Sequence, residues 1–426
     1  MQENLLHFIW YHKAFDTSKL RAETGEAIEI IHPGIPNSGE GPDFLDARIR
    51  LDSQLWAGNV EIHVKASDWF AHGHENDRRY DSVILHVVYD YDMPVFNTQN
   101  AEIPVLSLKN LIPSAILKRY NTLHFPKHKL ACKVFLPELN DWDKTAWLDR
   151  LFVERLERKT GLPEQWLRLT THDWQAVLYR MLFRYFGMPH NSDAFEHAAQ
   201  KLPFKIINRH RHDLDDLQAL FFGITGLLEN GPHDDDFKQY LKQRYDFFRH
   251  KYRLQPGFHP LKFGRMRPVN FPTVRLAQLA MLWNRHDNLF DNLIKNNDNE
   301  KILEILQTNV PEYWQTHYLF GRPLKKKSKR LGKTFAINLL INVILPLKWT
   351  YARYRNDAEP GFVLDAAEKL PPENNRITRL FSENGIRVQS AKESQALIQL
   401  YENYCTQNKC LSCAWGNRFL KHAKNR

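Results

Sequence analysis

The sequence predicts an α/β domain with a mixed sheet, followed by a mainly α-helical domain. Two observations carry this prediction. Short segments of strand-like composition cluster in the first third of the chain, and from about Asp141 onward apolar residues recur at helical spacing. We therefore expect residues 1–130 to form the α/β domain and residues 131–426 the helical domain. A length of 426 residues with 43% hydrophobic residues is enough for a full core in each.

The first domain is expected to begin with a helix at residues 2–14, where Leu5, Phe8 and Ile9 lie near helical spacing. The predicted strands are residues 27–31, 44–51, 55–65 and 83–89, and residues 103–108 are a candidate for a further strand. The run at 83–89 is almost entirely apolar, which is typical of a central strand covered on both faces. A polar connection precedes it. The expected order is helix, three strands, connection and strand.

The second domain contains four segments with clear helical periodicity, at residues 147–159, 174–186, 214–228 and 271–283. The most apolar stretch, residues 335–347, is interrupted by Asn338, Asn342 and Pro346. It is shorter than the ~20 residues that span a bilayer, so a buried helix is predicted. The first residues lack the pattern of a signal peptide. We therefore expect a cytoplasmic protein without membrane association.

The net charge of +10 is unevenly distributed along the chain. Residues 1–130 hold 13 Lys and Arg against 17 Asp and Glu, a net charge of −4, whereas the remainder holds 46 against 32, a net charge of +14. A basic second part favours a polyanionic partner, most simply nucleic acid. Candidate phosphate contacts are Lys325, Lys326, Lys327, Lys329, Arg330, Arg267 and Arg275. A solvated loop, or arginines that are buried or bridge a cap, are the alternatives.

Four polar residues are expected to converge at the second and third predicted strands. Glu61, His63 and Lys65 alternate along one strand and therefore project from one face. Antiparallel pairing brings Asp43, at the start of the preceding strand, beside them. An odd-numbered loop of residues 53–55 would place Asp43 on the same face. Two carboxylates, an imidazole and an ammonium group would then lie within a few ångströms of one another.

Such a cluster is suited to phosphodiester hydrolysis. The carboxylates of Asp43 and Glu61 would bind Mg²⁺ or Mn²⁺, which polarises a phosphate and acidifies bound water. His63 or Lys65 would orient or deprotonate that water or offset charge in the transition state. The alternative is structural: Asp43 would cap a turn, and Glu61 would pair with Lys65 on a solvated face.

The pair Pro42-Asp43, followed by Glu61-Ile62-His63, resembles the signature of PD-(D/E)xK nucleases. The predicted element order is similar to the αβββαβ, restriction-endonuclease-like core of that family. The resemblance implies that Asp43 and Glu61 are metal ligands. Its lysine position is occupied here by His63, and Lys65 follows two residues later.

Histidines in and after the connection suggest a second way to hold a metal. His72, His74 and Asp77 offer a His-x-His pair with a nearby carboxylate, which suits Zn²⁺, Mn²⁺ or Fe²⁺. Exposed or turn-stabilising histidines are the alternative. His86 lies within an apolar strand and is expected to be either a core histidine or a partner that orients a ligand.

The four cysteines form a further candidate metal site. Cys405, Cys410 and Cys413 lie within nine residues, and Cys132 is available as a fourth ligand. In a reducing compartment such clustering favours a metal site, either zinc or an iron–sulfur cluster, over disulfides. The spacing also resembles the start of plant-type ferredoxin ligation, and some PD-(D/E)xK nucleases carry iron–sulfur clusters. Buried free thiols are the alternative.

Motifs along nearly the whole chain resemble those of a widespread bacterial family of uncharacterised proteins. They include GPDF-x-DA, VEIH-x-KASDW, H-x-H-x-x-D-x-x-Y, FG-x-x-GLL, RP-x-N-x-P-x-x-R and the terminal cysteines. The family implies no activity. The leading hypothesis is therefore a divalent-metal-dependent nuclease, with two alternatives: an inactive scaffold that binds nucleic acid or protein, and a His-based metallohydrolase of a small substrate.

Overall fold

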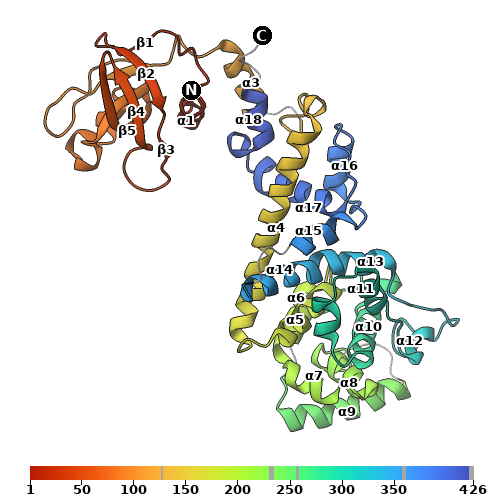
Figure 1. Ribbon diagram of the computed structural model, residues 1–426. Helices are drawn as coiled ribbons and strands as arrows, with labels where there is room; N and C mark the ends of the chain where they lie inside the picture. Colours follow the sequence, from red (N-terminus) through yellow and green to blue (C-terminus); the bar gives the residue numbers. More distant parts are fainter. Residues whose placement is uncertain (126–127, 230–234, 256–258, 357–360, 422–426) are drawn as a thin grey trace. The chain divides into compact units, whose positions relative to one another are not determined.

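The computed structural model describes residues 1–125, 128–229, 235–255, 259–356 and 361–421 (Figure 1). They form two compact units. Unit 1 comprises Met1–Trp147, Leu380–Arg387 and Ile398–Arg426, and unit 2 comprises Leu148–Arg379 and Val388–Leu397. From the sequence, the cysteine-containing end of the chain was expected in the helical domain. The structure instead groups it with the sheet.

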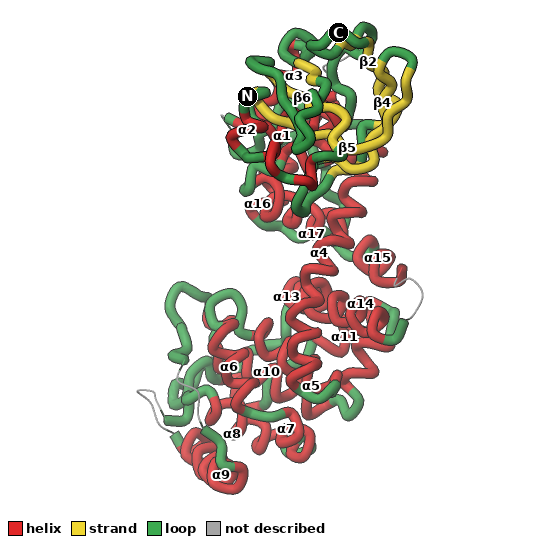
Figure 2. Tube along the Cα trace, turned by 90° about the vertical axis from the view of Figure 1, so that its left-hand side faces the viewer, coloured by secondary structure: helices red, strands yellow, loops and turns green. Residues whose placement is uncertain are grey.

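Unit 1 is built on a seven-stranded mixed sheet with the order β1-β2-β4-β5-β6-β7, in which β3 also pairs with β4. Neighbours from β1 to β5 are antiparallel, whereas β6 is parallel to β5 and β7 is parallel to β6. Figure 2 shows these strands in yellow. The strands are β1 (Leu20–Arg21), β2 (Ala27–His32), β3 (Ile35–Pro36), β4 (Phe44–Leu51), β5 (Gln54–Lys65), β6 (Val83–Asp90) and β7 (Val105–Ser107).

The helices of unit 1 are short apart from the first part of α4. Helix α1 buries Leu5, Leu6 and Ile9 and packs against β5. The single turn α2 and two 3-10 turns occupy the polar connection between β5 and β6. The helical elements are α1 (Glu3–Tyr11), α2 (Asp68–Ala71), η1 (His74–Asn76), η2 (Arg78–Tyr80), α3 (Ser114–His124), η3 (Leu136–Glu138), η7 (Tyr401–Cys405), η8 (Cys410–Ser412) and α18 (Ala414–Lys421).

The hairpin between β4 and β5 differs from the prediction. Leu51 pairs with Gln54, so the loop has two residues instead of the expected three. Asp52 begins this tight loop with a φ of +49°. If regular pairing continued from it, Asp43 would lie opposite Ile62 and would face away from Glu61.

A β-bulge restores the expected neighbourhood of Asp43. The register shifts between Phe44 and Ala47, and Asp46 within the bulge has a φ of +56°. Beyond the bulge Phe44 pairs with Val60. The next pair therefore sets Asp43 opposite Glu61, and directly opposite residues share a face. The loop prediction was wrong, but the predicted proximity of the two acidic residues is confirmed.

Unit 2 is helical, as predicted. A long helix, α4 (Asp141–Leu169), begins in unit 1 and contributes most of its length to unit 2. The other elements are α5 (Trp174–Phe186), α6 (Ser192–Lys201), α7 (Phe204–His210), α8 (Leu214–Ile224), α9 (Asp236–Tyr252), η4 (Pro268–Asn270), α10 (Pro272–Arg285), η5 (Asp291–Lys295), α11 (Asn299–Leu306), α12 (Glu312–Thr316), α13 (Lys333–Leu339), η6 (Leu340–Ile344), α14 (Leu345–Tyr354), α15 (Gly361–Glu368), α16 (Arg376–Ser382) and α17 (Ala391–Leu400).

The most apolar helical stretch, Lys333–Tyr354, is long and apolar enough to cross a membrane by composition alone. However, 72% of its most apolar window is buried inside the protein. Pro346 lies inside this stretch, just after the π-turn η6, where the regular α-helical hydrogen-bond pattern is already interrupted. Burial to this extent is typical of a core helix, which confirms the prediction of a buried helix.

Candidate metal centre

The carboxylates of Asp43 and Glu61 each accept a hydrogen bond from the backbone of the segment that carries the other. The backbone N–H of Asp43 donates to Glu61 Oε2 at 3.0 Å, and the backbone N–H of Ile62 donates to Asp43 Oδ2 at 3.0 Å. Glu61 is only 4% exposed. Burial raises the pKa of its carboxyl group. Glu61 does not lie on a solvated face, so the alternative in which it pairs with Lys65 there is wrong.

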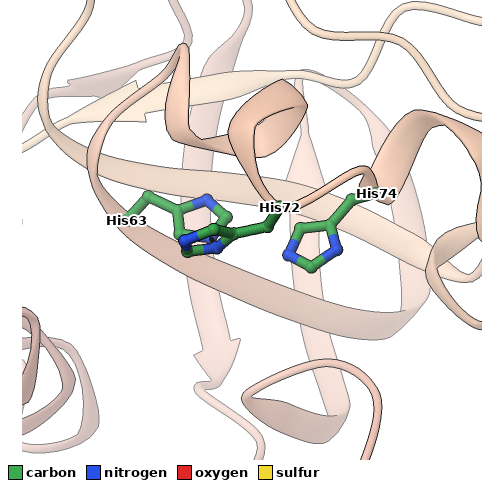
Figure 3. A group of neighbouring side chains, drawn as sticks. All are labelled: His63, His72 and His74. Carbon is green, nitrogen blue, oxygen red and sulfur yellow. Dashed lines mark hydrogen bonds between the residues drawn. The ribbon is translucent and has the colours of Figure 1, made fainter.

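Three histidines gather beside Glu61. The closest ring nitrogens of His63, His72 and His74 all lie within 4.8 Å of one another (Figure 3). His63 Nε2 is 3.0 Å from His72 Nδ1 and 3.6 Å from Glu61 Oε1. His74 Nε2 is 3.3 Å from the same carboxylate oxygen. One strand and the following connection therefore converge on Glu61 Oε1.

His63 has a partner on each side of its ring. Its Nδ1 lies 2.9 Å from Nε2 of His86 on the neighbouring strand β6, where both residues are buried. Burial, together with the nearby His72 and His74, lowers the pKa of His63 to about 3. A neutral imidazole keeps one nitrogen without a proton, as a metal ligand requires. When Nδ1 of His63 donates a hydrogen bond to His86, Nε2 carries no proton and can bind a metal ion. His86 thereby orients the His63 ring.

His74 is fixed by aromatic packing. Its ring stacks on Tyr80 with centroids 3.7 Å apart and meets Trp69 edge-on at 5.3 Å. Trp69 and Tyr80 belong to an apolar cluster that holds the connection on the sheet. His74 is 8% exposed, and its Nε2 faces Glu61 Oε1 at 3.3 Å. An imidazole nitrogen and a carboxylate oxygen at this separation can bind one metal ion together.

His7 of α1 is a site residue that the sequence did not indicate. Its Nε2 lies 3.2 Å from Asp43 Oδ2 and 3.8 Å from Glu3 Oε1. Burial acts to lower the pKa of His7, but the Asp43 carboxylate outweighs it and the pKa is raised. The available signal was the i,i+4 pair of Glu3 and His7, a polar stripe on an otherwise apolar helix.

A cavity of about 740 Å³ opens onto this side of the site. His7 and Asp43 line it together with residues of α1, α3 and the segment 407–412. Its size is in the range of small-molecule sites, which are usually ~300–1,000 Å³. Asp43 and His7 are therefore the members of the cluster that a molecule in the cavity would meet first.

The spacing of the donor atoms fits a divalent metal ion. With metal–ligand bonds of ~2.1 Å, two ligands of one ion lie roughly 3.0 Å apart at octahedral and roughly 3.4 Å apart at tetrahedral angles. The separations around Glu61 Oε1 and His63 Nε2 are 3.0, 3.3 and 3.6 Å. His63, His72 and His74 thus form a group that could hold an ion, with His72 as its exposed member, and Glu61 adds a carboxylate oxygen beside His63 and His74.

Two other predicted site residues lie apart from this cluster. Lys65 ends β5 with an exposed side chain, and its backbone N–H donates to Asp68 Oδ2 at 2.8 Å. Asp77 caps η2 by accepting from the backbone of Arg79 and pairs with its guanidinium at 2.6 Å. Asp77 faces Arg79 because the 3-10 turn directs it there, so its prediction as a ligand beside His72 and His74 is corrected.

The candidate phosphate contacts in unit 2 differ in exposure. Lys329 is buried: its Nζ donates to the carbonyl oxygens of Trp314 and His317 and lies 4.2 Å from the centre of the Tyr318 ring. It is therefore not available to phosphate, and the prediction for it is corrected. The exposed residues are Lys325, Lys326, Lys327, Arg330 and Arg267.

Arg275 is also buried, as one of the alternatives expected. It donates to Gln278 Oε1 at 3.0 Å and to Asn270 Oδ1 at 2.7 Å, and its guanidinium lies 3.7 Å from the centre of the Phe335 ring. These contacts stabilise the start of α10. Its role is thus structural, unlike that of the exposed Arg267.

Family comparison agrees with one resemblance noted in the sequence. A family model described as "Protein of unknown function (DUF2851)" matches residues 3–376. The chain belongs to this family. The DUF2851 match contains the whole candidate metal centre and Cys132 but ends before Cys405, Cys410 and Cys413. The chain matches no curated protein and no solved structure.

Proposed function

We propose that this DUF2851 protein is a hydrolase that uses a divalent metal ion to cleave phosphodiester bonds in DNA or RNA. One observation carries the proposal: a buried carboxylate oxygen of Glu61 lies within 3.6 Å of nitrogens of His63 and His74, and a third histidine, His72, lies 3.0 Å from the same nitrogen of His63. A buried polar cluster of this kind is costly unless each group has a partner. A shared metal ion would satisfy all of them.

The arrangement of elements supports a PD-(D/E)xK-like core. Helix α1 precedes three successive antiparallel strands, β2, β4 and β5, and the short α2 then leads to β6, which is parallel to β5. Apart from the two-residue strands β1 and β3, this order is similar to the αβββαβ order that the sequence resemblance implies, which supports the proposal. Asp43 and Glu61 face each other at the motif positions, and His63 stands where that family has lysine. The exposed basic residues of unit 2 support a polyanionic substrate.

The donor set favours a different metal from the one that the sequence favours. Mg²⁺ prefers oxygen ligands, whereas imidazole nitrogens suit Zn²⁺, Mn²⁺ or Fe²⁺. Three histidines and one carboxylate fit the second group. We therefore infer that Mn²⁺, Zn²⁺ or Fe²⁺ would bind more tightly than Mg²⁺.

The residues of the site would have different roles. Glu61, His63, His72 and His74 would hold the ion, which when bound polarises the scissile phosphate and acidifies water. Asp43 would accept the N–H of His7 at Nε2 and so orient its ring. Nδ1 of the His7 ring would then be available to accept a proton from the attacking water on the cavity side. Removing either member of this pair would leave metal binding largely intact and slow the reaction.

The cavity favours a second candidate function, hydrolysis of a small metal-activated substrate. A volume of about 740 Å³ beside His7 and Asp43 would enclose such a molecule. Both candidates use the same metal ligands. They differ in the substrate that is turned over, so one experiment can separate them.

The test is hydrolysis by the full chain after chelation and reloading with Mg²⁺, Mn²⁺, Zn²⁺ or anaerobic Fe²⁺. Substrates would be single- and double-stranded DNA, RNA, bis(4-nitrophenyl) phosphate and 4-nitrophenyl acetate. Glu61→Gln should lower kcat by more than ~100-fold because it removes a ligand charge. Asp77→Asn is the matched control: its carboxylate faces Arg79, so activity should stay within about twofold of wild type.

The outcomes distinguish the proposals. Cleavage of nucleic acid that Glu61→Gln abolishes and Asp77→Asn retains supports the nuclease. Turnover of small esters alone supports the second candidate. Equal cleavage by wild type and Glu61→Gln, or no turnover with any of these metals, would reject a metal-dependent hydrolase and leave the binding scaffold.

A further inference from the structure

A second cavity, of about 310 Å³, lies within unit 2. Its walls are the connection between α5 and α6, the segment 265–270 and the start of α10. Helix α5 packs against both α6 and α10, which brings these segments together. The volume is at the lower end of the ~300–1,000 Å³ that is usual for small-molecule sites. The cavity therefore suits a small ligand or one chemical group of a larger molecule.

The segments that form the walls are fixed to their neighbours. Asn191 is buried, and its side-chain amide makes two hydrogen bonds with the backbone of Lys262: Nδ2 donates to the carbonyl oxygen at 2.9 Å, and Oδ1 accepts from the N–H at 2.7 Å. The ring of Phe263 meets that of Phe271, directly before α10, edge-on at 5.3 Å. The walls are thus held in place before a ligand binds, which lowers the entropy cost of binding.

The lining of this cavity is basic. Arg265 and Arg267 are exposed, Arg275 is buried, and the exposed His190 adds a ring that can donate a hydrogen bond. None of the described residues that line the cavity is acidic. Guanidinium groups around one small space repel one another unless an anion lies between them. The lining therefore favours an anionic ligand.

Arg275 is a buried cation with only neutral partners. It is 6% exposed, and among the described residues its guanidinium contacts the side-chain oxygens of Gln278 and Asn270 and the ring of Phe335. These structural contacts leave its buried Nε–H without a hydrogen-bond partner. Burial lowers the pKa of Arg275 to about 10, so the group stays charged at neutral pH. A buried charge of this kind is costly unless an opposite charge lies beside it.

The start of α10 adds to the preference for an anion. Phe271, at the N-cap of α10, makes no side-chain capping hydrogen bond, and Pro272 in the first turn lines the cavity. The N-terminus of a helix has unpaired N–H groups and a partial positive charge, and phosphate groups commonly bind there. Arg275 follows three residues later in the same helix. The helix and the buried guanidinium thus attract the same kind of ligand.

We propose that this cavity binds a phosphate group, either inorganic phosphate or a terminal phosphate monoester, through Arg265, Arg267 and Arg275. The forked guanidinium group binds phosphate oxygens in pairs, and a dianion offsets several positive charges better than a single carboxylate does. The phosphate would also give Nε of Arg275 the partner that it lacks. The inference does not depend on the proposed hydrolase activity, because the cavity lies in unit 2 and the candidate metal centre in unit 1.

The test is calorimetric titration of the full, metal-chelated chain with inorganic phosphate at constant ionic strength. We expect saturable binding of about one phosphate per chain. Arg265→Gln and Arg267→Gln should each weaken it by ~10-fold or more, since each removes a charge-assisted hydrogen bond. Arg322→Gln is the matched control: it removes an exposed charge outside the cavity lining and should bind within about twofold of wild type. Glu61→Gln should also bind like wild type, which separates this cavity from the metal centre.

A measurement on the wild-type chain covers the case in which the arginine variants do not fold. Phenylglyoxal modifies arginine side chains, and peptide mass spectrometry locates the modified residues. Inorganic phosphate should protect Arg265 and Arg267 from modification and leave Arg322 unprotected. Absence of saturable phosphate binding, equal binding by wild type and both variants, or equal protection of all three arginines would overturn the proposal.

A pair of DNA ligands identifies the source of the phosphate. One short strand carries a 5′-phosphate, and the other has the same sequence with a 5′-hydroxyl group. Binding of the phosphorylated strand that is tighter by ~10-fold or more, with the difference lost in Arg267→Gln, assigns the cavity to a strand end. Equal binding of the two strands, together with saturable binding of inorganic phosphate, assigns it to free phosphate or a small phosphate ester.

Discussion

Gly223, in the last turn of α8, lies directly under the ring of Tyr245 of α9. A Cβ atom at Gly223 would lie 2.1 Å from Cγ, 2.2 Å from Cδ2 and 2.4 Å from Cδ1 of Tyr245. Tyr245 is fully buried, so its ring has no solvent to move into. Gly223→Ala must therefore separate two packed helices or force a strained side chain.

The magnitude follows from two opposing contributions. Overpacking a core typically costs ~1–3 kcal/mol, and three ring atoms in collision place this site at about the upper limit. Alanine is favoured over glycine by up to ~1 kcal/mol within a helix, which is an upper limit for the last turn of α8. The net expectation is a loss of ~2 kcal/mol in the unfolding free energy of unit 2. For a unit of this size, that corresponds to a decrease in Tm of roughly 4–8 °C.

Urea unfolding followed by circular dichroism would measure this change, with two further variants. Gly161→Ala in α4 is the matched control: no atom lies within 4 Å of its added Cβ, so it should stabilise the helix by up to ~1 kcal/mol. Combining Gly223→Ala with Tyr245→Leu should cost less than the sum of the two single changes by about 1 kcal/mol or more. A Gly223→Ala protein as stable as Gly161→Ala would refute the packing argument.

Three more predictions concern individual side chains. His86→Leu removes the partner of His63 Nδ1 and should weaken metal binding by ~10–100-fold, measured by competition with a chelator; an unchanged Kd would show that His86 does not orient the ligand. Burial lowers the pKa of Lys348 from 10.5 to about 8. Between these two pH values the unfolded chain binds one more proton than the folded chain, so the unfolding free energy should rise with pH from about 8 to 10.5. Lys348→Met should remove this rise, and an equally steep pH profile of stability in the variant would contradict the assignment. Replacing the exposed Lys325, Lys326 and Lys327 by Ala should weaken DNA binding and its salt dependence with little change in stability. Lys329→Ala should instead lower stability, because it leaves two buried carbonyl oxygens without a hydrogen-bond donor. The reverse pattern in binding and melting assays would show that side-chain exposure does not decide which lysines contact DNA.

Local patterns in the sequence were enough to predict most of the sheet. The alternation at residues 44–51 and the apolar run at 83–89 gave β4 and β6 within about one residue at each end. The register between β4 and β5 could not be predicted in this way, because it depends on a bulge at Asp46 that no composition signal marks. The acidic pair was predicted correctly only because the bulge offset the wrong loop length.

Long-range contacts decided which site residues were predicted correctly. Glu61 and His63 follow from period-2 alternation within one strand. His7 comes from a separate helix, and its proximity to Asp43 depends on how α1 packs on the sheet. Lys329 lies in the charged run 325–330, whose composition predicts exposure to solvent. It is nevertheless buried, and its Nζ donates hydrogen bonds to the carbonyl oxygens of Trp314 and His317. Charge runs report composition, whereas burial depends on tertiary structure.

The division into two units has a consequence for synthesis on the ribosome. The segment that begins at Ile398 belongs with the sheet, although all of unit 2 except Val388–Leu397 is made between Leu148 and Arg379. At ~5–20 residues per second, the residues from Leu148 to Leu397 take roughly 12–50 s to translate, and only then is the last segment of unit 1 made. The part of the protein that starts first is therefore finished last, and during that interval its unfinished surface is exposed to chaperones.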